Sequence, residues 1–192
     1  IVALVGTNNL STAIIILGIA VIVVFVSDKR YMQFVWIAAA GAGMMALFLG
    51  MESYRLERIA IWKNPEAYEK GYQTIQGLYA IGSGGLFGRG FGESIQKLGF
   101  VPEAQNDMIF SIICEELGFV GATILMLVFL MLIWRFMVIA VHAPDLFGSL
   151  IAAGAMGHIA IQVILNVAVV TNTIPNTGIT LPFISYGGTS VL

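Results

Sequence analysis

One acidic side chain, Asp107, stands at the boundary between a glycine-rich polar stretch and a long apolar segment. It ends the polar run 102–107 (PEAQND) and is the last charge before the apolar residues that begin at Met108. A carboxylate at such a boundary suits a general base, because a substrate could reach it from the water side. Asp107, or Asn106 beside it, could instead cap the following helix by accepting hydrogen bonds from its first N–H groups. The two roles are compatible.

Two further carboxylates, Glu115 and Glu116, follow within the apolar segment itself. On a continuous helix they would lie about 12–14 Å below Asp107. Carboxylates at that depth are costly and normally face the interior of a helical bundle or a wet cavity. We expect Glu115 and Glu116 either to fix helix packing or to form the floor of a substrate cavity.

A polar stripe recurs at four-residue spacing in the last long apolar segment, at His158, Gln162 and Asn166. Such residues commonly hydrogen-bond between helices inside a membrane. The alternative is that the stripe forms a wall of the same cavity as the two glutamates.

Four basic residues surround the glycine-rich stretch: Arg55, Arg58, Arg89 and Lys97. Arg55 and Arg58 are three residues apart and therefore share a helix face. Long basic side chains often reach from an apolar surface toward water. The functional alternative is a clamp for the phosphate of a lipid-linked substrate, which the guanidinium group suits geometrically.

Composition predicts that these residues are positioned by membrane helices. The 192 residues are 58% hydrophobic and 10% charged, with a mean hydropathy of +0.92, whereas soluble domains carry about 25% charged residues. The net charge of −2 gives no indication of a nucleic-acid partner. The single cysteine, Cys114, excludes an internal disulfide and is expected to be a small packed residue.

The predicted fold is all-α, a polytopic helical bundle that forms a single membrane domain. Its expected spans are residues 10–26, 31–51, 108–134 and 146–170, with a truncated fifth at 183–192. Residues 52–107 form a large outer loop, with a helical extension after residue 51 and a short interfacial helix at 73–81. Lys29, Arg30, Arg135 and His142 occupy the two short loops on the other side, so the positive-inside rule makes that side cytoplasmic.

The beginning of the chain has no Met and no basic stretch, so we expect no signal peptide and interpret the sequence as a piece of a longer protein. Zinc-binding, P-loop and G-x-S-x-G patterns are absent from the sequence. The glycines of residues 85–92 are not followed by Lys-Ser or Lys-Thr.

Several motifs in this order resemble the SEDS family (shape, elongation, division and sporulation), and within it the FtsW and SpoVE branch rather than RodA. They cover nearly the whole chain: residues 9–13 (NLSTA), 72–73 (YQ), 78–88 (LYAIGSGGLFG), 102–104 (PEA), Asp107, 109–110 (IF), 115–118 (EELG) and 182–188 (PFISYGG).

The resemblance implies the C-terminal part of a ten-helix membrane protein: helices six to nine, the fourth extracellular loop and the start of helix ten. The essential loop carboxylate of the family matches Asp107. Gln105-Asn106 stands before it, where the family often has His-Thr. By the same likeness we assign substrate binding to polar residues around the loop: Arg55, Arg58, Lys97, Glu115, Glu116 and Ser185.

The expected activity is polymerisation of lipid II into peptidoglycan strands at the outer face of the bacterial plasma membrane during division, with release of undecaprenyl diphosphate. Basic residues, or a divalent cation, would stabilise the leaving diphosphate, and a class B penicillin-binding protein would be the partner, with other membrane proteins of the division machinery. The alternatives are a lipid II flippase and a scaffold for that transpeptidase. The piece alone is expected to be inactive.

Overall fold

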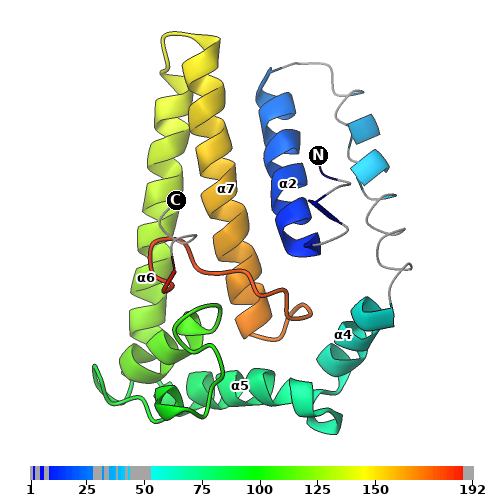
Figure 1. Cartoon of the computed structure of the whole chain (residues 1–192). Helices are drawn as coiled ribbons and strands as arrows, with labels where there is room; N and C mark the ends of the chain where they lie inside the picture. Colours follow the sequence, from blue (N-terminus) through cyan, green and yellow to red (C-terminus); the bar gives the residue numbers. More distant parts are fainter. Residues whose placement is uncertain are drawn as a thin grey trace. The chain divides into compact units, whose positions relative to one another are not determined.

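The computed structural model describes residues 2, 5, 6, 9–27, 32, 35–37, 39–41, 43 and 53–187, without the side chains of residues 10 and 53–56. All regular elements in this part of the chain are helices (Figure 1). The longer ones are α2 (Leu10–Ser27), α4 (Ser53–Lys63), α5 (Tyr72–Gly84), α6 (Ile109–Val141) and α7 (Leu146–Val170). Single 3-10 turns lie at Pro65–Ala67, Glu69–Gly71 and Gln96–Leu98.

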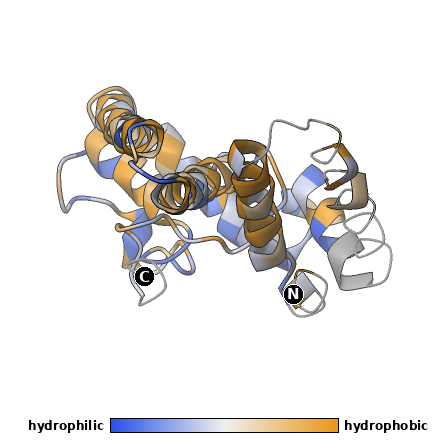
Figure 2. Cartoon of the chain, turned by 90° about the horizontal axis from the view of Figure 1, so that it is seen from above, coloured by the Kyte–Doolittle hydropathy of each residue, from blue (hydrophilic) through white to orange (hydrophobic). Residues whose placement is uncertain are grey.

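Helices α6 and α7 are long and apolar enough to cross a membrane, and α2 contains a shorter apolar helix over Ser11–Ser27. Their hydrophobic colouring stands out in Figure 2. The all-helical fold and its membrane character are therefore confirmed. The bounds of α7 coincide with the predicted segment 146–170, and Asp145 caps its start by accepting a hydrogen bond from the Gly148 N–H at 2.9 Å.

Other expected spans differ from the structure or lie outside it. Most of the predicted span 31–51 falls outside the described residues. Residues 183–187 form turns rather than the start of a helix, and residues 188–192 are not described. The turns follow from local chemistry, because the Ser185 hydroxyl accepts a hydrogen bond from the Leu181 N–H at 2.7 Å and Gly187 has φ +135°.

The chain divides into two compact units, and the first comprises Ile1–Leu56 and Leu130–Ile161. Here α2 packs closely on α7 through glycines. A Cβ atom added to Gly18 would collide with Ile161, and one added to Gly157 would collide with Ile22. Small residues allow helix backbones to approach in lipid, where no hydrophobic force draws helices together. In the described part of the first unit, α2 and α7 are therefore in close contact.

The second unit comprises Glu57–Phe129 and Gln162–Leu192, and it contains Asp107. Its core includes three fully buried side chains that come from widely separated parts of the sequence: Met108, Val163 and Leu181. The predicted outer loop is largely ordered, since α4 and α5 both lie within it. The expected helix at 73–81 is found inside α5, which is longer by one residue at its start and three at its end.

Helix α6 is broken at Gly118, whose φ of 67° and ψ of −168° are not helical. The break separates a short segment, 109–117, from the long apolar segment that follows it. The prediction of an uninterrupted span with Glu115 and Glu116 inside it is therefore wrong. Both glutamates precede the break, and the next sixteen residues, 119–134, carry no charge. This arrangement keeps the two carboxylates out of the apolar segment, where burial would be costly.

Candidate functional site

The glycine-rich loop after α5 forms hydrogen bonds with the backbone groups that the break in α6 leaves without helical partners. A helix end leaves N–H and C=O groups without partners, and here both ends created by the break need them. The loop supplies N–H donors to the segment before the break and carbonyl acceptors to the segment after it. The four main-chain hydrogen bonds are Arg89 N to Glu115 O at 2.9 Å, Gly90 N to Glu116 O at 3.0 Å, Phe119 N to Gly85 O at 2.9 Å and Val120 N to Leu86 O at 3.0 Å.

Two glycines make this contact possible, because the two backbones touch at their positions. A Cβ atom on Gly118 would meet the Leu86 carbonyl, and one on Gly88 would meet the carbonyl of Glu116. Both glycines also have positive φ, at +67° and +77°, which side chains rarely adopt. The glycine-rich sequence therefore serves close packing against α6.

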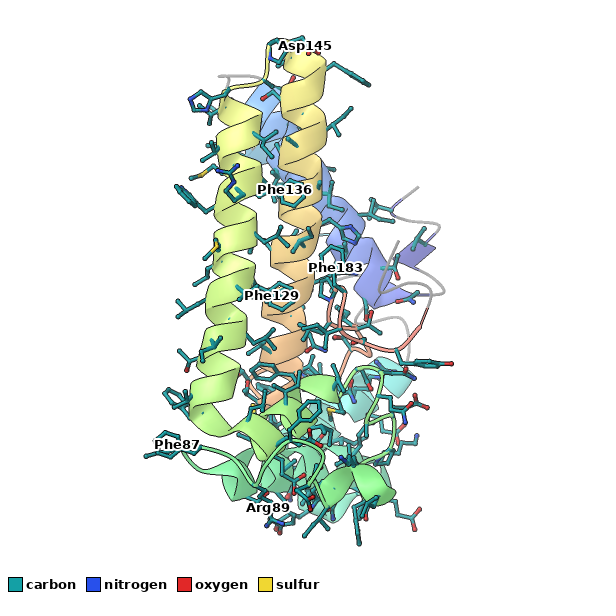
Figure 3. The ribbon with its side chains drawn as sticks, turned by 90° about the vertical axis from the view of Figure 1, so that its left-hand side faces the viewer. Phe87, Arg89, Phe129, Phe136, Asp145 and Phe183 are labelled. Atoms are coloured by element: carbon teal, nitrogen blue, oxygen red, sulfur yellow. The ribbon has the colours of Figure 1, made fainter. Side chains whose placement is uncertain are left out.

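The Glu115 carboxylate is buried, with 1% of the side chain exposed, and it holds the loop to α6. A buried charge needs hydrogen bonds and a counter-charge to offset its lost hydration. The loop provides both: the donors are Ser94 Oγ, Ser83 Oγ at 3.4 Å, and the N–H groups of Ile95 and Gln96, each at 3.3 Å, with Arg89 Nε 3.7 Å away. Figure 3 shows Arg89 and Phe87 at this end of the second unit, with Phe87 pointing away from the ribbon.

Glu116 binds the same loop through Lys97. The Lys97 ammonium lies 2.7 Å from Glu116 Oε1, and the Gly92 N–H donates to Glu116 Oε2 at 3.0 Å. Glu115, Glu116 and Lys97 were expected to contact substrate, and that role stays a prediction. In the structure Glu116 pairs with Lys97, and Glu115 binds Ser94 and lies near Arg89. The break at Gly118 explains these contacts, since it turns this short segment toward the loop.

Asp107 lies just before α6 and is buried, with 8% of the residue exposed. The expectation of a carboxylate exposed to water is therefore wrong for this part of the chain. Gln73 Nε2 lies 3.3 Å from Asp107 Oδ1 and 3.5 Å from Oδ2, and Asn166 Nδ2 donates to the Asp107 main-chain carbonyl at 2.7 Å. Side chains from α5 and α7 thus hold Asp107 from two directions.

Burial raises the pKa of Asp107 above its usual value of 3.8. Its own backbone N–H opposes this shift by stabilising the charged form, while the negative charge of Glu103 reinforces it. The hydrogen bond from Gln73 lowers the pKa again, by a smaller amount. A carboxyl with a raised pKa is a better proton acceptor than an ordinary aspartate, because basicity increases with pKa.

The segment 181–187 forms a strap that holds the residues just before Asp107. The Ser185 hydroxyl donates to the Asn106 carbonyl at 2.7 Å, and the Tyr186 N–H donates to the Gln105 carbonyl at 2.8 Å. The Ser185 hydroxyl also accepts from the Leu181 N–H, and the residue is 5% exposed. The Ser185 hydroxyl thus orders the loop, and the expected substrate binding by Ser185 stays a prediction.

Of the predicted arginine pair, Arg55 and Arg58, only Arg58 has a described side chain. Arg58 Nη1 donates to the Asn176 carbonyl at 2.9 Å, and Trp62 Nε1 donates to the Asn172 carbonyl at 2.9 Å. These bonds tie α4 to the loop that follows α7. The Arg55 side chain lies outside the described part of the chain. A phosphate clamp by Arg55 and Arg58 stays a prediction.

The sequence did not predict that three residues would lie at this site: Gln73, Asn166 and Asn176. Gln73 was noticed only as part of a motif, and Asn166 only as one member of a polar stripe. Asn176 had no signal beyond its place in a short polar loop between two prolines. The structure brings all three to Asp107 or to one another, and Asn166 is the stripe residue that does so.

In the described ranges, no group of three or more His, Cys, Asp or Glu residues is arranged to hold a metal ion. The divalent cation considered as a counter-charge for a diphosphate stays a prediction, and no chemical step is derived from it here. The positive charges near the site come from arginine and lysine side chains.

The fold fits an integral membrane protein, with a buried, hydrogen-bonded carboxyl just before the short helical segment 109–117. The family model for the cell cycle proteins FtsW, RodA and SpoVE matches residues 1–192. The chain belongs to this family.

Relatives of known name agree with this assignment. The chain is 47% identical to the stage V sporulation protein E of Bacillus subtilis, over 95% of the chain and 50% of that protein. It is 41% identical to a probable peptidoglycan glycosyltransferase FtsW of Trichlorobacter lovleyi, over 96% of the chain and 49% of that protein. The chain thus spans about half the length of these relatives.

A similar solved structure comes from a study of the structural coordination of polymerization and crosslinking by a peptidoglycan synthase complex. It matches 98% of this chain and 53% of its own chain, with a TM-score of 0.74 and 29% sequence identity. The fold described above is therefore similar to that of a chain in this peptidoglycan synthase complex.

Proposed function

We propose that the full-length protein containing this chain is a peptidoglycan glycosyltransferase that polymerises lipid II, with Asp107 as its general base. The relatives named as probable glycosyltransferases support the activity. The observation that carries the role of Asp107 is its hydrogen-bonded, buried position directly before α6, with a raised pKa.

In the proposed reaction, Asp107 accepts the proton of the 4-hydroxyl of the acceptor sugar. The resulting oxygen attacks the anomeric carbon of the donor, a new glycosidic bond forms, and the bond to undecaprenyl diphosphate breaks. The diphosphate leaves with the bonding electrons, and Asp107 retains the proton until it exchanges with water. A proton acceptor placed in this way contributes about 10²- to 10⁴-fold in rate.

The leaving diphosphate needs positive charge near it as it departs. Among the described side chains, Arg58 of α4 is the strongest candidate. It donates to the main-chain carbonyl of Asn176, whose side chain donates to Gln73. Arg55 is three residues away on the same helix. Lys97 is a weaker candidate, since Glu116 already offsets its charge.

The site would face the outer side of the bacterial plasma membrane in a multi-pass protein. The lipid tails of the substrate would stay in the bilayer. A class B penicillin-binding protein is the proposed partner, by analogy with the peptidoglycan synthase complex of the similar structure. The division role follows from the FtsW relatives, while the sporulation relative supports the equivalent role in spore formation.

The contacts of the two glutamates argue against a flippase as the main function. A transporter would need polar groups free to line a path through the membrane. Glu115 and Glu116 instead bind the loop at residues 83–97. A scaffold without catalysis would need no buried carboxyl before α6, so it leaves the burial of Asp107 unexplained.

Purified full-length protein, with its partner transpeptidase, tests the proposal by polymerisation of lipid II in vitro. Asp107→Asn should reduce the rate at least about 100-fold. Glu66→Gln is the matched control, because it removes one exposed loop carboxylate and should leave the rate unchanged. Normal polymerisation by Asp107→Asn, in protein that folds and binds its partner, would overturn the base role.

A further inference from the structure

Three polar side chains lie in series at the site, and they come from three separate segments of the second unit. Asn176 Nδ2 donates to Gln73 Oε1 at 3.3 Å, and Gln73 Nε2 donates to the Asp107 carboxylate at 3.3 and 3.5 Å. Asn176 belongs to the loop after α7, Gln73 to the first turn of α5, and Asp107 to the loop before α6.

The partners at both ends of the Gln73 amide favour the same direction for this series: Nε2 faces the Asp107 carboxylate and lies 3.4 Å from the Pro102 carbonyl, while Oε1 accepts from Asn176. An amide has a donor end and an acceptor end, and only the donor end suits a carboxylate. Asn176 presents its own N–H to Gln73 because its carbonyl oxygen, Oδ1, is already used by the Gly178 N–H at 2.9 Å. The Asn176 main-chain carbonyl is in turn held by Arg58. The Nε2 end of Gln73 therefore faces Asp107.

We propose that Gln73 is a positioning residue that orients the Asp107 carboxylate for proton transfer, and that Asn176, by donating to Gln73 Oε1, helps to hold the Nε2 end of the amide toward it. This inference rests on the proposed function and names two residues that the base would require. Gln73 acts through the Asp107 carboxylate that it contacts, and Asn176 acts through Gln73.

The number of Gln73 contacts fits this role. A single Nε2 group lies 3.3 Å from Asp107 Oδ1 and 3.5 Å from Oδ2, at the long end of the hydrogen-bond range, so it occupies only part of the carboxylate's capacity. An ionised carboxylate has about four acceptor positions. Gln73 thus favours the ionised form, against the effect of burial, and leaves capacity for the hydroxyl of the acceptor sugar.

The test measures the rate of lipid II polymerisation against pH for variants of the full-length protein with its partner. Gln73→Met removes the donor with little change in shape, and Gln73→Glu places a second acceptor against Asp107. Gln76→Met, one turn later on α5, is the matched control. Both Gln73 variants lose the hydrogen bond that favours the ionised form of Asp107, so the base becomes harder to ionise. Both should therefore lose about tenfold in rate on the acid side and recover toward wild type at high pH.

The second arm perturbs the Gln73 amide through Asn176 without changing Gln73. Asn176→Asp keeps the acceptor for Gly178 but replaces the donor to Gln73 Oε1 with an acceptor, so it should compete with Asp107 for the Nε2 group and weaken the Gln73 contact to Asp107. The acid limb of the pH profile should then move to higher pH, as in Gln73→Met. Asn172→Asp adds the same charge to the same loop and is the control.

The combination of Asn176→Asp with Gln73→Met separates the series from a direct effect of charge. If Asn176 acts through Gln73, the double variant has the profile of Gln73→Met alone. A further shift in the double variant, an unchanged profile in the single variants, or an equal loss of rate at every pH would overturn the proposal. If Gln73→Met does not fold, Asn176→Asp and its control decide alone.

Failure of this inference is distinguishable from failure of the proposed function. An inactive Asp107→Asn with unaltered Gln73 and Asn176 profiles rejects only the positioning role. A fully active Asp107→Asn rejects the base, and the positioning role with it.

Discussion

Asn166 Nδ2 donates to the main-chain carbonyl of Asp107, although the two residues are 59 positions apart in the sequence. The same nitrogen donates to the Ile179 carbonyl at 2.7 Å. Asn166 is fully buried, so a single amide group joins α7, the loop before α6 and the loop after α7. This contact places the proposed base by its backbone, independently of the Gln73 contact to its side chain.

The first prediction concerns this contact. Asn166→Leu should destabilise the protein by about 2 kcal/mol or more, because two buried carbonyls lose their donor. Thermal unfolding in detergent, followed by tryptophan fluorescence, measures the loss. Gln162→Leu, one turn earlier on α7 and only half-buried, should cost much less. Equal stability of the two variants would show that the Asn166 bonds contribute little.

The second prediction concerns the charge of Glu103. Its negative charge disfavours ionisation of Asp107, so Glu103→Gln should lower the pKa of Asp107. The acid limb of the polymerisation rate should move to lower pH, with about a twofold gain in rate on that side, as expected for an exposed charge. The gain should fade in high salt, which screens exposed charges. A shift toward higher pH, or one insensitive to salt, would contradict this account.

The third prediction links Asp107 to stability. Its pKa is raised in the folded state, so the folded protein binds a proton more readily than the unfolded chain, whose value is near 3.8. Wild type therefore loses stability as pH rises from 3.8 through the folded-state pKa. Asp107→Asn removes this penalty, so its advantage in melting temperature should grow from pH 4 to pH 7, while polymerisation is lost.

Asp145→Asn is the control for that experiment, because Asp145 stabilises the start of α7 through the Gly148 N–H. Asn can still cap the helix, but the negative charge at its N-terminus is lost, so the melting temperature at neutral pH should fall slightly. A melting temperature of Asp107→Asn below wild type at pH 7 would show that burial of the carboxylate is not the dominant effect.

The fourth prediction concerns the break in α6. Gly118→Ala requires a side chain at φ +67° and a collision with the Leu86 carbonyl, so it should destabilise the protein by about 2 kcal/mol or more. Gly82→Ala, on an exposed part of α5, meets nothing within 4 Å and should be neutral or stabilising by about 0.5–1 kcal/mol. Hydrogen exchange of residues 85–97 should increase only in Gly118→Ala. Similar melting temperatures for both variants would contradict a tight contact at Gly118.

The sequence by itself determined the helical class of the protein, its membrane character and the existence of its longest elements. The end of α6 was predicted at residue 134, but the helix continues to Val141, so Arg135 lies within it and not in a short loop. Length and hydropathy are local properties, so the bounds of α7 and the existence of α5 and α6 could be predicted from them. The family motifs also directed attention to Asp107 before any geometry was known.

Only the tertiary structure decided what the polar residues contact. Gly118 ends one helical segment because the loop at residues 85–90 supplies partners for both broken ends, and that loop is distant in sequence. For the same reason Glu115, Lys97 and Ser185 hold loops, while Gln73, Asn166 and Asn176 reach the site. Hydropathy marks a side chain as polar, but its hydrogen-bond partner depends on which distant segments pack beside it.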